Sequence, residues 1–174
     1  MSGILCVLLL TTALAGQPFS IEVDRGAEAL VVQFELAGEL PPSVEGVLGS
    51  GLATEIDYTF RVYARRRLFP DRKVWKGVAK ASVTFDAVTG RYRCQMIVNG
   101  TTTASREVDT AEAARRWLTA PPAVVVALPR GRQGAHLRVR ARAVFSSGTA
   151  WLIFPSTEGT DWVEVQLPAA PGDT

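Results

Sequence analysis

The sequence predicts a mainly β, single-domain protein: an antiparallel β-sandwich or curved sheet of about seven or eight strands with one α-helix. Apolar and polar residues alternate along several segments, which is the pattern of strands with one buried face. Turn-forming Gly, Pro, Asn and Asp residues separate these segments at short spacing. One clear helical pattern lies near residues 110–118, and the strand-helix-strand alternation of a parallel sheet is missing.

The chain is organised around a predicted meander of three strands between Glu55 and Val98. In the first strand, residues 55–65, alternate positions form an apolar face, made of Ile56, Tyr58, Phe60 and Val62. The second strand, residues 74–85, follows a turn at Pro70-Asp71. The third, residues 92–98, places Cys94 inward as a small buried residue and ends at an Asn99-Gly100 hairpin turn.

Further strands are predicted on both sides of this meander. A short extended arm at 21–24 precedes a strand at 30–36, and residues 136–145 alternate with arginines outward. Residues 123–128 are apolar on both faces, so we expect a central or doubly covered strand there. A hairpin of residues 149–154 and 162–167 is expected to close the fold.

The helix is predicted from its N-terminal signal. Asp109 and Glu112 have the spacing of a capping box with Asp109 as the N-cap. An apolar stripe that includes Trp117 continues to about Leu118, and Pro121-Pro122 stops the helix. Residues 41–48 are expected to hold one or two further helical turns within a connector.

The N-terminal segment predicts export. Residues 4–15 are apolar but too short to cross a bilayer, and small residues before Gly16 favour cleavage after Ala15. An uncleaved anchor or a buried N-terminal helix is the alternative. We therefore expect a signal peptide at 1–15, a β-rich domain at 16–174 with a flexible tail at 167–174, no transmembrane segment after cleavage, and a periplasmic or secreted location.

Familiar catalytic and metal-binding motifs are missing from the sequence. It contains no Walker, Gly-x-Ser-x-Gly, His-Glu-x-x-His or Cys-x-x-Cys pattern. The single histidine, His136, is expected on an exposed face beside arginines, which disfavour a metal ion. Asp71 and Asp86 fall in turns, where aspartate commonly caps its own backbone. We expect neither a cofactor nor an enzyme activity; a hydrolase is the weakest of the functions considered.

Charge is distributed unevenly although the formal net charge is only +2. Between Arg61 and Lys80 eight cations accompany one acid, Asp71. Arginines also alternate along residues 136–145, where successive outward side chains stand about 7 Å apart and repel unless anions lie across from them. The candidate anion-binding residues are Arg61, Arg65, Arg67, Arg72, Arg138, Arg140 and Arg142. The alternative is that acids on neighbouring strands neutralise them, or that the cations simply face solvent. The candidate acids are Glu22, Asp24, Glu28, Glu35, Glu55, Asp57 and Glu164.

A family resemblance accompanies these patterns. It is carried by Leu48, Ser50-Gly51, Tyr58, Val62-Tyr63, Arg65, Arg67, Phe69, Asp71 and Val74, then by Asp86, Val88-Thr89 and Tyr92, and finally by a capped helix and an arginine-alternating strand. This order, from about Ala29 to Val144, resembles the exported bacterial family catalogued as domain of unknown function 4390. The resemblance implies an exported protein with one folded unit and assigns no catalytic residue.

Two functions are compatible with the sequence. The first is a non-enzymatic exported module whose arginines contact an anionic envelope component: a lipid head group or an acidic region of an envelope protein. The second is a structural or interaction domain that docks a membrane-associated partner through a sheet edge or an aromatic surface made by Phe69, Trp75, Trp151 and Trp162. We do not expect nucleic acid as a partner, since export separates the protein from it.

Overall fold

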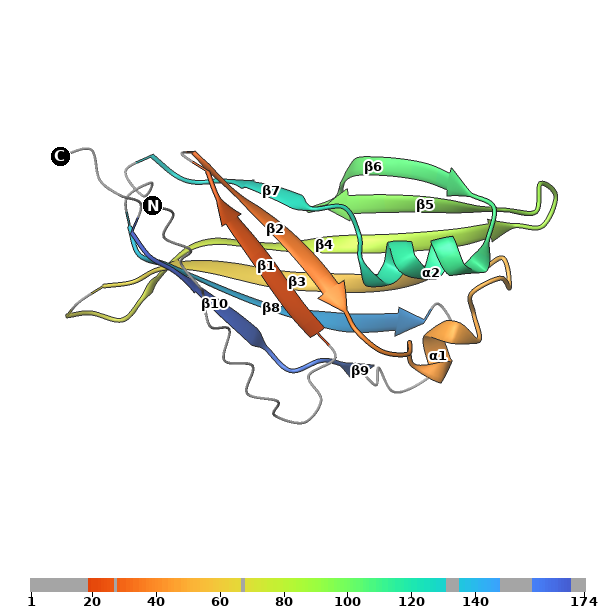
Figure 1. Ribbon diagram of the computed structural model, residues 1–174, viewed down its shortest axis with the longest axis horizontal. Coiled ribbons are helices and arrows are strands. Elements are labelled where there is room, and N and C mark those ends of the chain that lie inside the picture. The colour runs from red at the N-terminus through yellow and green to blue at the C-terminus, as the bar shows by residue number, and fades with distance from the viewer. Residues whose placement is uncertain (1–18, 27, 67, 131–134, 148–157, 170–174) are drawn as a thin grey trace, which may run out of the picture.

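The computed structural model describes residues 19–26, 28–66, 68–130, 135–147 and 158–169. Several features named from the sequence lie outside the described residues: the predicted signal peptide, Arg67, Trp151, the predicted strand at 149–154 and the end of the predicted tail. Within the described parts the protein is a β-sandwich of two antiparallel sheets with two helices (Figure 1). The predicted fold class is therefore confirmed.

The larger sheet forms one layer and has the strand order β10-β8-β3-β4-β5-β6. Its strands are β3 (Thr54–Ala64), β4 (Arg72–Asp86), β5 (Arg91–Val98), β6 (Thr101–Val108), β8 (Leu137–Ser147) and β10 (Val163–Leu167). The short strand β9 (Glu158–Gly159) also pairs with β8. The predicted meander becomes β3, β4 and β5, and Asn99 and Gly100, both with positive φ, make the turn from β5 to β6.

The smaller sheet forms the second layer, with the order β1-β2-β7. It consists of β1 (Phe19–Arg25), β2 (Ala29–Leu36) and β7 (Val124–Ala127). Figure 1 shows β1 and β2 crossing obliquely over the long strands of the larger sheet. The smaller sheet thus covers one face of the larger sheet, here called its inner face, and leaves the opposite outer face to the charged residues.

The core lies between the two sheets because the apolar positions of each strand point inward. Tyr58 of β3 stacks on Phe34 of β2 with ring centroids 4.9 Å apart, and Phe60 meets Phe34 edge-on at 5.3 Å. The buried Tyr58 hydroxyl donates a hydrogen bond to the Leu118 carbonyl. This bond ties the centre of the larger sheet to the end of a helix.

The helices extend the second layer beyond the smaller sheet. Helix α2 (Ala111–Thr119) buries Ala114 and Leu118, and the Trp117 indole donates to the Gln95 carbonyl of β5. The predicted N-cap was one residue early, because the Thr110 hydroxyl, not Asp109, accepts from the Ala113 backbone N–H. The connector forms the short helix α1 (Pro42–Glu45).

Two strand predictions need correction. The described residues form ten strands, since β6 and β9 join the seven or eight expected. Strand β7 is apolar on both faces and was expected to be central, but it lies at an edge of the smaller sheet and leaves Val125 69% exposed. The prediction was wrong because two apolar faces do not prove that both are covered. An edge strand can leave one apolar face exposed to solvent.

Candidate functional site

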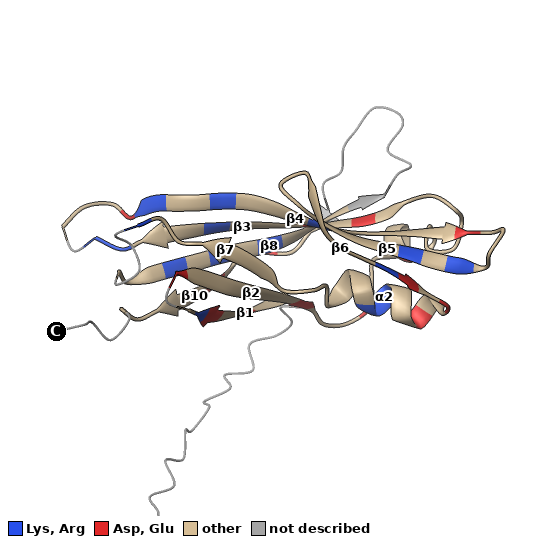
Figure 2. Ribbon diagram, turned by 90° about the horizontal axis from the view of Figure 1, so that it is seen from above, with Lys and Arg blue, Asp and Glu red and all other residues tan. Residues whose placement is uncertain are grey.

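The outer face of the larger sheet brings the two arginine-bearing strands together. Strands β3 and β8 pair antiparallel, and Arg61 stands directly opposite Arg140. Arg138 and Arg142 flank Arg140 on β8, and Lys76 of β4 lies opposite Arg61 on its other side. Figure 2 shows the basic residues recurring along β3, β4 and β8. We call this surface the arginine face; its cations are Arg61, Arg65, Lys76, Lys80, Arg138, Arg140 and Arg142.

Four acids neutralise part of the arginine face. Glu55 accepts a hydrogen bond from Lys80, whose ammonium also lies 3.9 Å from Asp57. At the other end, Arg138 lies 2.8 Å from an Asp71 carboxylate oxygen. The predicted neutralisation by cross-strand acids is thus partly realised, and the structure adds Asp71 to it.

Glu164 of β10 is the fourth acid, and two arginines share it. Its carboxylate lies 3.7 Å from the Arg138 guanidinium and 3.5 Å from that of Arg140. Arg138 also has Asp71, whereas Arg140 has only this shared carboxylate within 4 Å among the described residues and is therefore incompletely compensated.

Three cations in the middle of the arginine face have no carboxylate within 4 Å among the described residues: Arg61, Lys76 and Arg142. Arg61 and Arg140 are direct neighbours on adjacent strands, a placement that is destabilising for like charges. Positive charge is thus concentrated at the centre of the face, where Glu164 stands opposite Arg140, and the other three acids lie toward the two ends.

Trp162 contacts three arginines at the centre of the arginine face. Its ring lies 4.8 Å from the Arg61 guanidinium carbon, 5.1 Å from that of Arg142 and 5.5 Å from that of Arg140. A cation near an aromatic face is attracted by the electrons of the ring, so one indole holds three guanidinium groups close to one another. Tyr63 makes the same kind of contact with one arginine: the guanidinium carbon of Arg138 lies 5.1 Å from the phenol ring.

The guanidinium donors of this cluster are only partly used. The Nε atoms of Arg138, Arg140 and Arg142 are buried and make no hydrogen bond among the described residues, although that of Arg140 lies 3.5 Å from Glu164. Guanidinium groups recognise phosphate and carboxylate through paired N–H donors. The arrangement is suited to binding an anionic oxygen group. It is unsuited to a cation, and the described residues contain no cluster of His, Cys, Asp and Glu side chains that would hold a metal ion.

The pKa of Asp57, on this face, is raised above its ordinary value. Loss of water around the carboxyl raises the pKa, the Lys80 ammonium partly lowers it, and the Glu55 carboxylate adds to the increase. Its Oδ1 is buried without a hydrogen bond among the described residues. Ionised Asp57 is therefore retained next to the cationic centre at a cost in solvation.

The structure separates the seven arginines named from the sequence. Arg61, Arg138, Arg140 and Arg142 lie together, and Arg65 lies at the end of the same face, where it donates to Gln166. Arg72 stands opposite the inward-facing Ala64 at the end of β3, away from the cluster. Arg67 lies outside the described residues.

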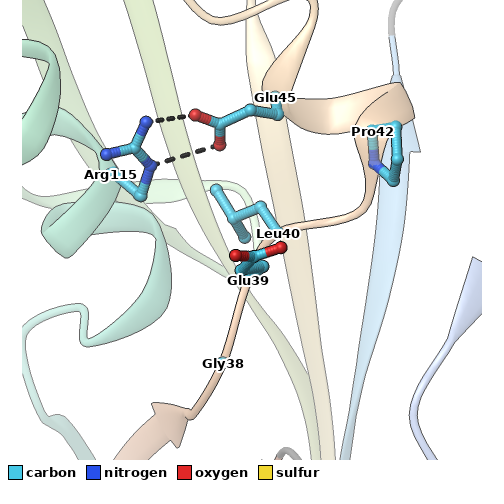
Figure 3. A pocket seen from close by; sticks show the side chains of 6 residues that line it. All are labelled: Gly38, Glu39, Leu40, Pro42, Glu45 and Arg115. Carbon is cyan, nitrogen blue, oxygen red and sulfur yellow. Dashed lines mark hydrogen bonds and ion pairs between the residues drawn. The ribbon is translucent and has the colours of Figure 1, made fainter.

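A pocket beside the two helices offers different chemistry. It has a volume of about 510 Å³ and is lined by Leu40, Glu45 and Arg115 among others. Figure 3 shows the Arg115 guanidinium and the Glu45 carboxylate joined across it. The hydrogen bond from Arg115 holds the pKa of Glu45 below its ordinary value. A carboxylate kept ionised by an arginine partner ties α1 to α2 and is poorly suited to donating a proton.

Comparison with known proteins identifies the family. The family model described as domain of unknown function DUF4390 matches residues 18–150. The chain belongs to this family. No curated protein and no solved structure matches it.

The DUF4390 match spans β1 to β8, so it includes Arg61 and the three arginines of β8. Strand β10 and Trp162 lie after it. In this DUF4390 chain the arginines of β3 and β8 therefore belong to the matched part. The Trp162 indole and the Glu164 carboxylate, which contact these arginines, come from the segment after it.

The sequence did not assign Trp162 to the arginine cluster. It was considered only as part of an aromatic docking surface, because nothing local places it opposite Arg142. Val163 of β10 pairs with Ala141 of β8, so Trp162 lies beside Arg142. The register of these two strands would have revealed the contact, but one strand alone does not show its register.

None of the helices formed by the described residues is long and apolar enough to cross a bilayer.

Proposed function

We propose that this protein is a non-enzymatic, exported binding module whose arginine face recognises phosphate or carboxylate groups of an anionic envelope component. The observation that supports this proposal is the triangle of Arg61, Arg140 and Arg142 around Trp162. Like charges held this close favour the arrival of an anion, which relieves their repulsion.

The arrangement also favours an extended anionic partner over a single ion. Arg65, which has no carboxylate within 4 Å among the described residues, continues the positive surface from the cluster toward the β3–β4 hairpin. A partner that carries several anionic groups would meet several guanidinium groups at once, and its combined affinity would exceed that of one contact. Salt would weaken the association because the groups are near the surface.

The test is binding of inorganic pyrophosphate, followed through tryptophan fluorescence because Trp162 lies within the cluster. The variant Arg61→Gln/Arg140→Gln/Arg142→Gln should lose more than about tenfold in affinity, since charge-assisted hydrogen bonds are each worth about 1.5–3 kcal/mol. A matched control, Arg91→Gln/Arg106→Gln/Arg116→Gln, removes the same charge elsewhere and should retain affinity to within a factor of about three. Equal losses in the two variants, or no binding by the wild type at low salt, would overturn the proposal.

A second candidate function is protein docking along an edge of the smaller sheet. The observation that favours it is β7, an edge strand whose Val125 side chain is exposed. Edge strands have unpaired backbone groups that can add a partner strand. Crosslinking from position 125 to a single protein, unaffected by salt, would support this function instead.

A further inference from the structure

The β3–β4 hairpin exposes two adjacent large apolar side chains. Leu68 is 85% exposed and Phe69 is 69% exposed. Figure 1 shows this hairpin, in yellow, projecting beyond the end of the smaller sheet. Scattered apolar residues are common on surfaces, but a neighbouring pair at the tip of a projecting hairpin is a candidate contact site.

Cations surround this apolar tip. Arg65 and Arg66 precede it, and Arg72 and Lys73 follow it. Arg66, Arg72 and Lys73 have no carboxylate within 4 Å among the described residues. The local acid, Asp71, is already paired with Arg138 at 2.8 Å. The base of the hairpin therefore carries uncompensated positive charge.

A small basic pocket lies beside the same hairpin. It has a volume of about 290 Å³, and the described residues that line it include Arg72, Lys73 and Arg130 but no acid. Val74 and Pro129 are the other described residues of its lining. Three cations around one hollow are suited to a phosphate group. Lys73 stands opposite Tyr63 at the end of the arginine face, but none of the three cations of this pocket belongs to the cluster around Trp162.

We propose that this end of the protein is a membrane-contact site for anionic phospholipid. Leu68 and Phe69 enter the boundary between head groups and acyl chains, and a lipid phosphate binds among Arg72, Lys73 and Arg130. A lipid surface offers apolar and anionic groups together, which is the combination the hairpin presents.

This site uses residues that the proposed recognition of anions does not use, so the two proposals can fail separately. The binding of the full chain to vesicles of phosphatidylglycerol and phosphatidylcholine, compared with vesicles of phosphatidylcholine alone, tests it by sedimentation. The variant Leu68→Ser/Phe69→Ser should bind the anionic vesicles at least about tenfold more weakly. The variant Arg72→Gln/Lys73→Gln/Arg130→Gln should show a similar loss and a weaker dependence on salt.

The matched control is Leu52→Ser/Val88→Ser, which removes two exposed apolar side chains that lie just before β3 and just after β4, at the strand ends away from the hairpin tip. It should bind as the wild type does. Since residues 4–15 are present in every variant and are themselves apolar, a second readout reports on the tip directly. Phe69→Trp should add fluorescence that lipids brominated on their acyl chains quench.

The proposal is overturned if the serine variant of the tip binds like the wild type and the fluorescence added by Phe69→Trp is not quenched. It is also overturned if Leu52→Ser/Val88→Ser loses as much binding as the tip variant. Loss of vesicle binding by the tip variant, with pyrophosphate binding unchanged, supports the membrane site independently of the arginine face.

Discussion

Arg61 of β3 and Arg140 of β8 stand directly opposite each other on adjacent antiparallel strands, with Trp162 in contact with both. Lys76 faces Arg61 from the other side, so three cations occupy neighbouring positions across three strands. Side chains directly opposite one another in such a pair are close neighbours, and like charges there are unfavourable. The arginine face therefore contains repulsion that the fold has to tolerate.

This repulsion predicts an unusual response to salt. Raising salt from about 0.01 M to about 1 M shortens the screening length from about 30 Å to about 3 Å. The free energy of unfolding of the wild type should rise over this range, and Arg61→Gln should remove about 0.5 kcal/mol of that increase. Urea denaturation at several salt concentrations measures it. An identical salt dependence in the two proteins would contradict the prediction.

Tyr58 provides a test of the core. Its hydroxyl donates to the Leu118 carbonyl, and Tyr58→Phe would leave that buried acceptor unpaired. The expected loss in the free energy of unfolding is about 1–3 kcal/mol. Chemical denaturation at neutral pH provides the measurement, and a change of less than a few tenths of a kcal/mol would mean that the bond contributes little.

The same residue predicts a loss of stability in alkali. Burial raises the pKa of Tyr58 above its ordinary value. In the unfolded chain tyrosine begins to ionise near about pH 10, whereas the folded protein keeps Tyr58 protonated. Stability should therefore fall as pH rises above that value, and Tyr58→Phe should show a smaller fall. Equal slopes for wild type and variant would argue against it.

Asp57 predicts how the free energy of unfolding changes in acid. Its raised pKa means that the folded protein takes up this proton more readily than the unfolded chain does. The solvation cost of the ionised carboxyl should therefore disappear as pH falls through the folded-state pKa. At neutral pH Asp57→Asn should be slightly stabilising, by less than about 1 kcal/mol. Below about pH 4 this advantage should vanish.

The Glu55→Gln substitution is expected to change stability in the direction opposite to Asp57→Asn. Glu55→Gln removes the carboxylate that accepts a hydrogen bond from Lys80 and should lower the free energy of unfolding at neutral pH. Denaturation curves of both variants between acidic and neutral pH give the comparison. A loss of stability in Asp57→Asn that equals the loss in Glu55→Gln would show that ionised Asp57 is favourable.

Gly77 provides a test of packing in β4. A Cβ atom at this position would overlap the Trp75 indole and lie 2.7 Å from the Asn99 side-chain oxygen. Trp75 has little freedom to move away because it also packs against Phe60, with ring centroids 4.6 Å apart. Gly77→Ala should therefore cost about 1–3 kcal/mol and change the near-ultraviolet circular dichroism. Val78→Ala, at the exposed neighbouring position, should change stability by no more than about 0.5 kcal/mol.

Much of the fold was readable from local pattern. Alternation predicted that Tyr58 and Phe60 lie inward and that Arg138, Arg140 and Arg142 lie together on the outward side of one strand. The capping signal located α2 to within about one residue. Strand β6 was missed because, apart from its last residue, its side chains are largely exposed and alternation has nothing to detect.

The sequence by itself determined which side chains share a face of each strand, since that depends only on the period of two along the chain. Tertiary structure alone decided that β3 lies beside β8, which brings Arg61 opposite Arg140 although 79 residues separate them. It also decided that Trp162 and Glu164 cover the arginines, and that Arg72 lies apart from them. Strand order and register depend on how whole layers bury their apolar surface together, and no single strand carries that information.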